Sequence, residues 1–145
     1  MNLLEPEWDA EVDAGDGAML RAVRLGLRAG AKSLGATLYE IEAGALVSPL
    51  HFHHANEELL FVLSGTPTLR TGPDSERILE PGETVAFPAG PRGTHQITNR
   101  SASTVRVLIC STNLLPEVAE QTETNMLAII TTDGLRLAPN TPTLA

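Results

Sequence analysis

Residues 49–65 read PLHFHHANEELLFVLSG and place three histidines and two glutamates directly before five consecutive apolar residues. An apolar run of this length, followed by a Ser-Gly turn signal, is typical of a buried strand. Imidazole and carboxylate groups resist burial unless they are hydrogen-bonded, paired or bound to a metal. The stretch therefore suggests that these polar groups hold a metal inside a β-structure.

The size and composition of the chain indicate one globular domain. Its 145 residues are enough for a single sizeable core, with 42% apolar and 19% charged residues. A net charge of −8 with scattered basic residues argues against a nucleic-acid partner. No apolar run approaches the roughly 20 residues that a membrane helix requires, so we expect no membrane partner.

Two features bear on the compartment. The first residues, MNLLEPEWDAEVD, are acidic where a signal peptide would be basic and then apolar. The single cysteine, Cys110, has no second cysteine with which to form an intramolecular disulfide, and it ends the apolar run VRVLIC, as a buried structural residue would. We therefore expect a cytoplasmic protein.

Turn signals rich in glycine and proline recur at short intervals through the middle of the chain. The segments between them are four to eight residues long, contain β-branched or aromatic residues and partly alternate in polarity. These strand-like segments are residues 36–41, 58–63, 67–71, 83–88, 95–99 and 104–111. Their regular spacing predicts an all-β sandwich or small barrel.

We expect a core at residues 36–112 between two extensions. Residues 1–35 form the N-terminal extension, irregular or β, and residues 113–145 form a C-terminal extension that packs on the barrel or on a partner subunit. Within the latter, residues 117–124 could form one helical turn, and Asp133-Gly134 predicts a hairpin turn between two apolar runs. A barrel of open sheets with extra strands at both sides predicts a homodimer.

The histidines set up the candidate site. His51 and His53 are two residues apart, so both point to the same face of a strand. Such a pair alone is more often a surface or hydrogen-bonded pair than a metal site. Alternation places Glu57 and Glu58 on opposite faces and leaves open which one accompanies the histidines. His95, in a second cluster, adds a third imidazole, and a mixed nitrogen and oxygen set suits a divalent first-row transition metal.

These residues resemble the two motifs of the cupin superfamily. The first motif, G(X)5HXH(X)3-4E(X)6G, is matched with one extra residue before the first histidine, and the second, G(X)5PXG(X)2H(X)3N, with two extra residues before its histidine. The matching residues are Gly44, His51, His53, Glu58 and Gly65 in the first motif and Gly82, Pro88, Gly90, His95 and Asn99 in the second. Two ordered motifs are far more specific than either alone.

The resemblance implies a jelly-roll-like β-barrel of two antiparallel sheets, similar to small single-domain bacterial cupins. It also implies that His51, His53, Glu58 and His95 bind one divalent metal per chain, with iron, manganese, nickel and zinc all open. The six residues between Glu58 and Gly65 fit the motif and favour Glu58 over Glu57 as the carboxylate ligand. Metal-dependent members of the superfamily include dioxygenases, decarboxylases, isomerases and lyases.

The alternatives are specific. The four polar residues could be a hydrogen-bonded cluster left from an ancestral metal site. By alternation, His54 and Glu57 are rim or surface residues, with a role towards a substrate as the second interpretation. Two function classes stay open: a metal-dependent enzyme acting on a small molecule, and a non-catalytic cupin that binds a small molecule or the metal. No residue outside the ligand set can be identified from the sequence as a catalytic acid or base.

Overall fold

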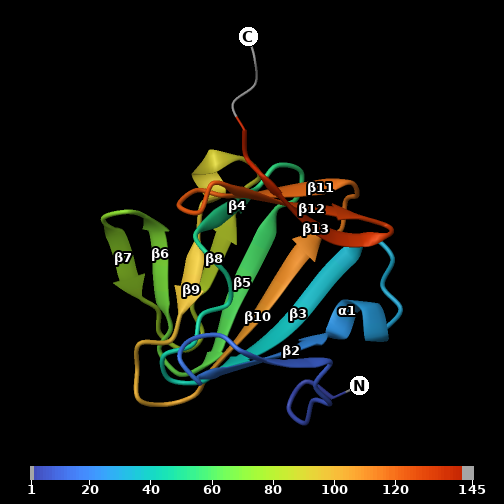
Figure 1. The fold of residues 1–145 in the computed structure, drawn as a ribbon. Coiled ribbons are helices and arrows are strands. Elements are labelled where there is room, and N and C mark those ends of the chain that lie inside the picture. The colour runs from blue at the N-terminus through green and yellow to red at the C-terminus, as the bar shows by residue number, and fades with distance from the viewer. Residues whose placement is uncertain (1, 142–145) are drawn as a thin grey trace.

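A computed structural model of the chain describes residues 2–141, and these residues form an almost entirely β-structure (Figure 1). The strands are β1 Ala10–Asp13, β2 Met19–Arg24, β3 Leu34–Ile41, β4 His51–His53, β5 Glu58–Ser64, β6 Thr68–Gly72, β7 Ser75–Ile78, β8 Thr84–Phe87, β9 Gln96–Thr98, β10 Val105–Thr112, β11 Glu117–Gln121, β12 Met126–Thr131 and β13 Gly134–Pro139. The helical segments are α1 Leu25–Arg28 and η1 Pro91–Gly93. Each of the six segments predicted to be strands overlaps with a strand of the structure.

The strands pair only with antiparallel neighbours and form two layers. One layer is the six-stranded sheet β1-β2-β3-β10-β5-β8. The other contains the four-stranded sheet β13-β12-β11-β4 and the three-stranded sheet β7-β6-β9. Isolated bridges, Leu46 to Thr98 and His51 to His95, join the two smaller sheets. The predicted all-β architecture with antiparallel sheets is confirmed.

Alternation along the central strands builds the core. Leu60 and Val62 of β5 are buried, and they lie beside Ile109 and Val107 of β10 in the antiparallel register. Ile41 at the end of β3 pairs with Val105 of β10 on the same face. The side chains of both layers therefore meet in one apolar cluster between the sheets.

Gly65 ends β5 at a position that requires glycine. Its φ of +76° lies in the left-handed region, which side chains rarely adopt. A Cβ atom at this position would lie 2.8 Å from Cγ2 of Val105 and 2.9 Å from the carbonyl oxygen of Thr104. The chain can therefore turn away from β5 and pass close to the start of β10 only because residue 65 has no side chain.

The last three strands position the site, because they extend the sheet that begins with β4. Figure 1 shows β11, β12 and β13, in orange and red, crossing the ends of the longer strands. In the register of this sheet, His53 pairs with Ala119, Ala119 with Ala128, and Ala128 with Leu137. Cross-strand partners point to the same face, so one continuous sheet face runs from the histidines of β4 to the leucines of β13.

One local expectation needs correction. Residues 117–121, expected in a helical turn, form β11 because β4 and β12 pair with them on either side. The N-terminal extension, expected to be irregular or β, contains β1, β2, the short helix α1 and the start of β3. The predicted hairpin at Asp133-Gly134 is present, with Thr131 of β12 paired to Gly134 of β13. Neither helical segment in residues 2–141 has the length and apolar character needed to cross a bilayer.

Candidate metal centre

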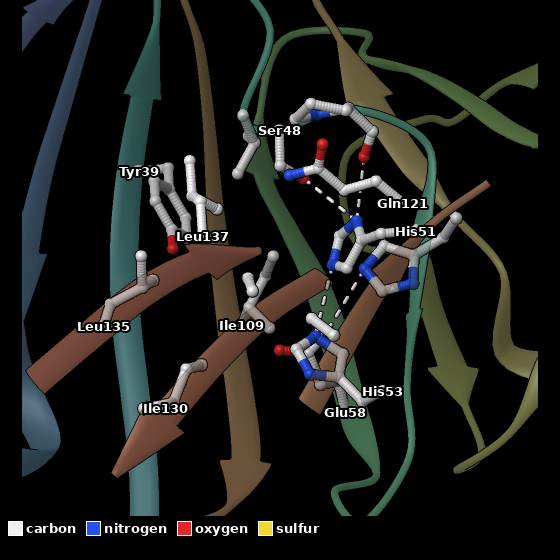
Figure 2. A pocket seen from close by; sticks show the side chains of 15 residues that line it. Tyr39, Ser48, His51, His53, Glu58, Ile109, Gln121, Ile130, Leu135 and Leu137 are labelled. Carbon is white, nitrogen blue, oxygen red and sulfur yellow. Dashed lines mark hydrogen bonds and ion pairs between the residues drawn. The ribbon is translucent and has the colours of Figure 1, made fainter. Parts of the chain in front are cut away.

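The structure brings the four predicted site residues together. His51 and His53 lie at the two ends of β4, Glu58 begins β5, and His95 directly precedes β9. The Nε2 atoms of His51 and His53 are 3.2 Å apart. Oε2 of Glu58 lies 3.4 Å from Nε2 of His53 and 3.1 Å from Nε2 of His95. Figure 2 shows His51, His53 and Glu58 converging at one end of a cavity.

Backbone pairing aligns the two sequence motifs. The amide of His95 donates to the carbonyl oxygen of His51 at 2.8 Å, and the amide of His51 donates to the carbonyl oxygen of His95 at 3.1 Å. The extra residues before His95 fold into η1, and the amide of Gly90 ahead of η1 donates to the carbonyl oxygen of His53 at 2.7 Å. The longer turn therefore does not displace His95, which lies directly beside His51.

Strand parity separates the two glutamates. Glu58 is half-buried and faces the histidines, whereas Glu57 is exposed in the turn before β5. His54 is also turned away from the cluster, and its Nε2 lies 3.0 Å from Oε2 of Glu120 on the outer face. The structure therefore brings Glu58, and not Glu57 or His54, to His51 and His53.

Hydrogen bonds at Nδ1 orient two of the imidazoles. Nδ1 of His51 lies 2.9 Å from the carbonyl oxygen of Pro49 and 3.2 Å from Oγ of Ser48. Nδ1 of His95 lies 2.8 Å from the carbonyl oxygen of Gly93. A carbonyl oxygen only accepts, so Nδ1 carries the proton in both rings and Nε2 presents its lone pair. Both Nε2 atoms are thus arranged to bind a metal.

His53 has a different neighbour, Glu117. Among the described residues, Nδ1 of His53 is the one buried side-chain nitrogen or oxygen without a hydrogen-bond partner. Oε2 of Glu117 lies 3.8 Å from it. Glu117 is only 2% exposed, and its carboxylate accepts hydrogen bonds from the Asn56 side chain and from backbone amides of residues 54, 55, 56 and 118. Sequence reasoning missed Glu117, because no motif or spacing marks it.

The electrostatics favour a neutral His51 beside an anionic Glu58. Burial lowers the pKa of His51 to about 4, and the neighbouring His95 and His53 act in the same direction. Burial would lower the pKa of His53 as well, but the hydrogen bond and the charge of Glu58 outweigh it and raise that pKa. Burial opposes ionisation of Glu58, yet its close contacts with the imidazoles of His53 and His95 hold its pKa well below its usual range.

A cavity of about 310 Å³ opens from this cluster. Beyond the histidines and Glu58, its walls are mostly aliphatic, with three uncharged polar residues: Tyr39, Ser48 and Gln121. Burial and the charge of Glu58 raise the pKa of Tyr39 to about 12, so its phenol is neutral at physiological pH. Figure 2 shows Ile109, Ile130, Leu135 and Leu137 on the side of the cavity away from the imidazoles.

The donor set fits a divalent transition metal. The donor atoms of His51, His53 and Glu58 all lie within 4.8 Å of one another, and His95 reaches the same carboxylate oxygen. Donors bound to one ion at about 2.1 Å lie about 3 to 3.5 Å apart. The contacts of His51 with His53, at 3.2 Å, and of Glu58 with His53 and His95, at 3.4 and 3.1 Å, lie in this range. Three imidazole nitrogens and one carboxylate oxygen also match the preferences of first-row divalent ions.

Comparison with known proteins identifies the family. A cupin-domain family model matches residues 37–111, slightly more than half of the chain. The chain therefore belongs to the cupin family, as its two motifs predicted. No functionally curated protein matches the chain significantly.

Several solved structures are similar over most of the chain. A sugar phosphate isomerase of the cupin superfamily from Silicibacter pomeroyi is 28% identical with a TM-score of 0.78, and the match covers 87% of this chain and 81% of that one. A protein from Acidithiobacillus ferrooxidans, for which the same activity is suggested, is 27% identical with a TM-score of 0.76, covering 89% and 83%. The polyketide cyclase RemF from Streptomyces resistomycificus is 26% identical with a TM-score of 0.61, covering 77% and 78%.

Proposed function

We propose that this cupin binds one divalent transition metal through His51, His53, Glu58 and His95 and acts as a metal-dependent enzyme on a small molecule. The observation that carries the proposal is the convergence of three imidazole nitrogens and one carboxylate oxygen at the end of an apolar cavity. A bound metal of this kind supplies a positive charge that polarises an oxygen atom of the substrate. Iron, manganese, nickel and zinc all stay candidates.

The protein's own residues have distinct parts in this proposal. Pro49 and Gly93 hold the rings of His51 and His95 through their carbonyl oxygens. The buried part of the aliphatic wall, at Ile109, Ala119 and Ala128, limits the access of water to the cluster and strengthens electrostatic interactions there. The neutral phenol of Tyr39 is a hydrogen-bond donor for a substrate oxygen within the cavity. The names of the similar structures, an isomerase and a cyclase, agree with an enzyme and leave the reaction type open.

A non-catalytic cupin that only binds a small molecule or the metal is the second candidate. One observation favours it: apart from the four proposed ligands, Tyr39 is the one titratable residue that lines the described cavity, and its pKa of about 12 is far from neutral pH. General acid-base catalysis works best with a group whose pKa lies near the working pH. Turnover of a small molecule by the metal-loaded protein would decide for the enzyme.

Metal analysis of protein prepared without an affinity tag tests the site. We expect about one divalent ion per chain, and we expect the double variant His51→Ala/His53→Ala to lose it. His54→Ala is the matched control, because His54 is exposed and paired with Glu120 outside the cluster. Full metal occupancy in the double variant would refute the proposed ligand set. Oxygen-uptake measurements with small acids, phenols and sugars would then separate redox from non-redox reactions.

We also propose a homodimer in the cytoplasm, with a core at residues 36–112 and the two extensions completing its sheets. β13 is an edge strand of the four-stranded sheet. The backbone groups along the outer side of an edge strand favour pairing with another chain. Light scattering should give twice the monomer mass of 15.4 kDa, and a monomer mass across micromolar concentrations would exclude the dimer.

A further inference from the structure

The cavity beside the proposed metal centre has one polar end and one hydrocarbon end. The sheet register explains this division, because His53 of β4, Ala119 of β11, Ala128 of β12 and Leu137 of β13 form one cross-strand row. Side chains in such a row share a face. A ligand that reaches the imidazoles therefore extends along the aliphatic side chains of the last three strands (Figure 2).

No lysine or arginine is among the residues that line this cavity, all of which the structure describes. Arg70, which precedes the turn at Gly72, is occupied elsewhere, because it donates to Glu123 at 2.9 Å and to Gln96 at 3.3 Å. The other polar side chains of the wall, those of Tyr39, Ser48 and Gln121, are uncharged. The inner part of the wall, at Ile109, Ala119 and Ala128, is buried, so a dianionic group placed against it would lose its hydration without gaining a cationic partner.

The charge at the polar end allows one negative charge on the ligand. A divalent ion together with the ionised Glu58 has a net charge of about +1, since the imidazoles bind as neutral ligands. Glu117, buried beside His53, adds a further negative charge close by. With Glu117 included the net charge falls to about 0, so the centre suits a ligand whose oxygen donors carry at most a single negative charge.

From these observations we propose that the cavity takes a small molecule with oxygen donors, carrying at most one negative charge, at one end and a hydrocarbon group at the other. The proposal rests on the metal-binding function proposed above. The proposed ligand also differs from the substrate class in the name of the Silicibacter pomeroyi protein, which is a phosphate ester. Leu137 is a determinant of this selectivity, because it lines the cavity opposite the imidazoles on the outermost strand, where its side chain is largely exposed at the open end.

Three 2-oxo acids with the same head test the proposal on the full-length, Co²⁺-loaded protein. These are 4-methyl-2-oxopentanoate with a branched hydrocarbon tail, pyruvate without that tail, and 3-phosphonooxypyruvate with a phosphate in its place. Calorimetry gives the dissociation constants, and the visible spectrum of Co²⁺ reports whether the head reaches the ion. We expect all three acids to change the spectrum. We expect 4-methyl-2-oxopentanoate to bind at least 10-fold more tightly than pyruvate or 3-phosphonooxypyruvate.

The variant Leu137→Arg supplies the missing cation and should tighten binding of 3-phosphonooxypyruvate at least 10-fold. Ile78→Arg is the control, because it adds the same charge at an exposed position on β7, away from this cavity. Binding of the phosphate compound by the wild type as tightly as the hydrocarbon compound would overturn the inference. So would bound Co²⁺ whose spectrum none of the three acids changes. Failure of the wild type to retain Co²⁺ would instead overturn the metal-binding function, and the inference with it.

Discussion

His53 and Glu117 face each other across two adjacent strands, with Nδ1 of the imidazole 3.8 Å from Oε2 of the carboxylate. The two residues are far apart in the sequence and meet because β11 pairs with β4. Metal-binding histidines commonly direct their second nitrogen at a carboxylate, which fixes the ring and makes it a better ligand. Glu117 therefore connects the C-terminal strands to the candidate metal centre.

The first prediction is that Glu117→Gln weakens metal binding by about 10-fold or more, the range for loss of a group that supports a ligand. The amide keeps the shape of the side chain but removes the charge that faces Nδ1 of His53. Competition with a chromophoric chelator gives the metal dissociation constant. Urea unfolding of the metal-free protein should accompany it, because Glu117 also accepts the amides of residues 54–56.

Glu57→Gln is the control for this measurement, because it removes one exposed carboxylate at the other side of the same turn. The metal dissociation constant and the urea unfolding measurement together separate the two roles of Glu117. A variant that is less stable but binds metal as tightly as the wild type would show that Glu117 only holds the turn and does not support His53.

The second prediction concerns pH. Imidazoles must be neutral to bind a metal, so protons compete with the ion as the pH falls. The raised pKa of His53 makes it the first of the β4 histidines to take up a proton, whereas His51, with a pKa of about 4, stays neutral well below pH 6. We expect the metal dissociation constant to increase as the pH is lowered from 7 to 5, measured in non-coordinating buffers.

Imidazole NMR signals of the metal-free protein check the order of protonation. The lowered pKa of His51 means that the unfolded chain binds its proton more tightly than the folded chain. His51 therefore contributes stability above pH 6.5, and this contribution is lost as the pH falls towards 4. A His51 signal that titrates near pH 6.5, or metal affinity that does not change between pH 7 and 5, would contradict this description of the site.

The third prediction tests the backbone at the end of β5. Gly65→Ala should lower the free energy of unfolding by more than about 2 kcal/mol, because the new Cβ adds close contacts with Val105 and Thr104 to a left-handed conformation. Gly82→Ala is a matched control: its φ is +90° and a Cβ there has nothing within 4 Å. This control should lose about 1 to 2 kcal/mol from conformation alone. Equal losses in urea denaturation would show that the close approach to β10 costs nothing.

The parts of this fold that were predictable have local causes. Alternation and turn residues were enough to locate β5 and β10, and the Asp133-Gly134 turn located the last hairpin. The position of Glu58 followed from spacing within a motif. The position of Glu117 had no such cause, because a five-residue segment next to Pro116 becomes a strand only through pairing with β4 and β12. Its approach to His53 is likewise a product of strand register, which a single sequence does not contain.

The fourth prediction distinguishes the two neighbouring glutamates at the start of β5. Glu58→Gln keeps the size of the side chain and removes its charge from a position 3.4 Å from Nε2 of His53 and 3.1 Å from Nε2 of His95. The metal dissociation constant should therefore rise by about 10-fold or more, since loss of a direct ligand should exceed loss of a supporting group. Glu57→Gln removes the same charge from an exposed side chain and should change the constant much less. The two variants have the same net charge, so long-range electrostatics alone would affect them almost equally. A greater loss in Glu57→Gln than in Glu58→Gln would mean that β5 presents its other face to the metal.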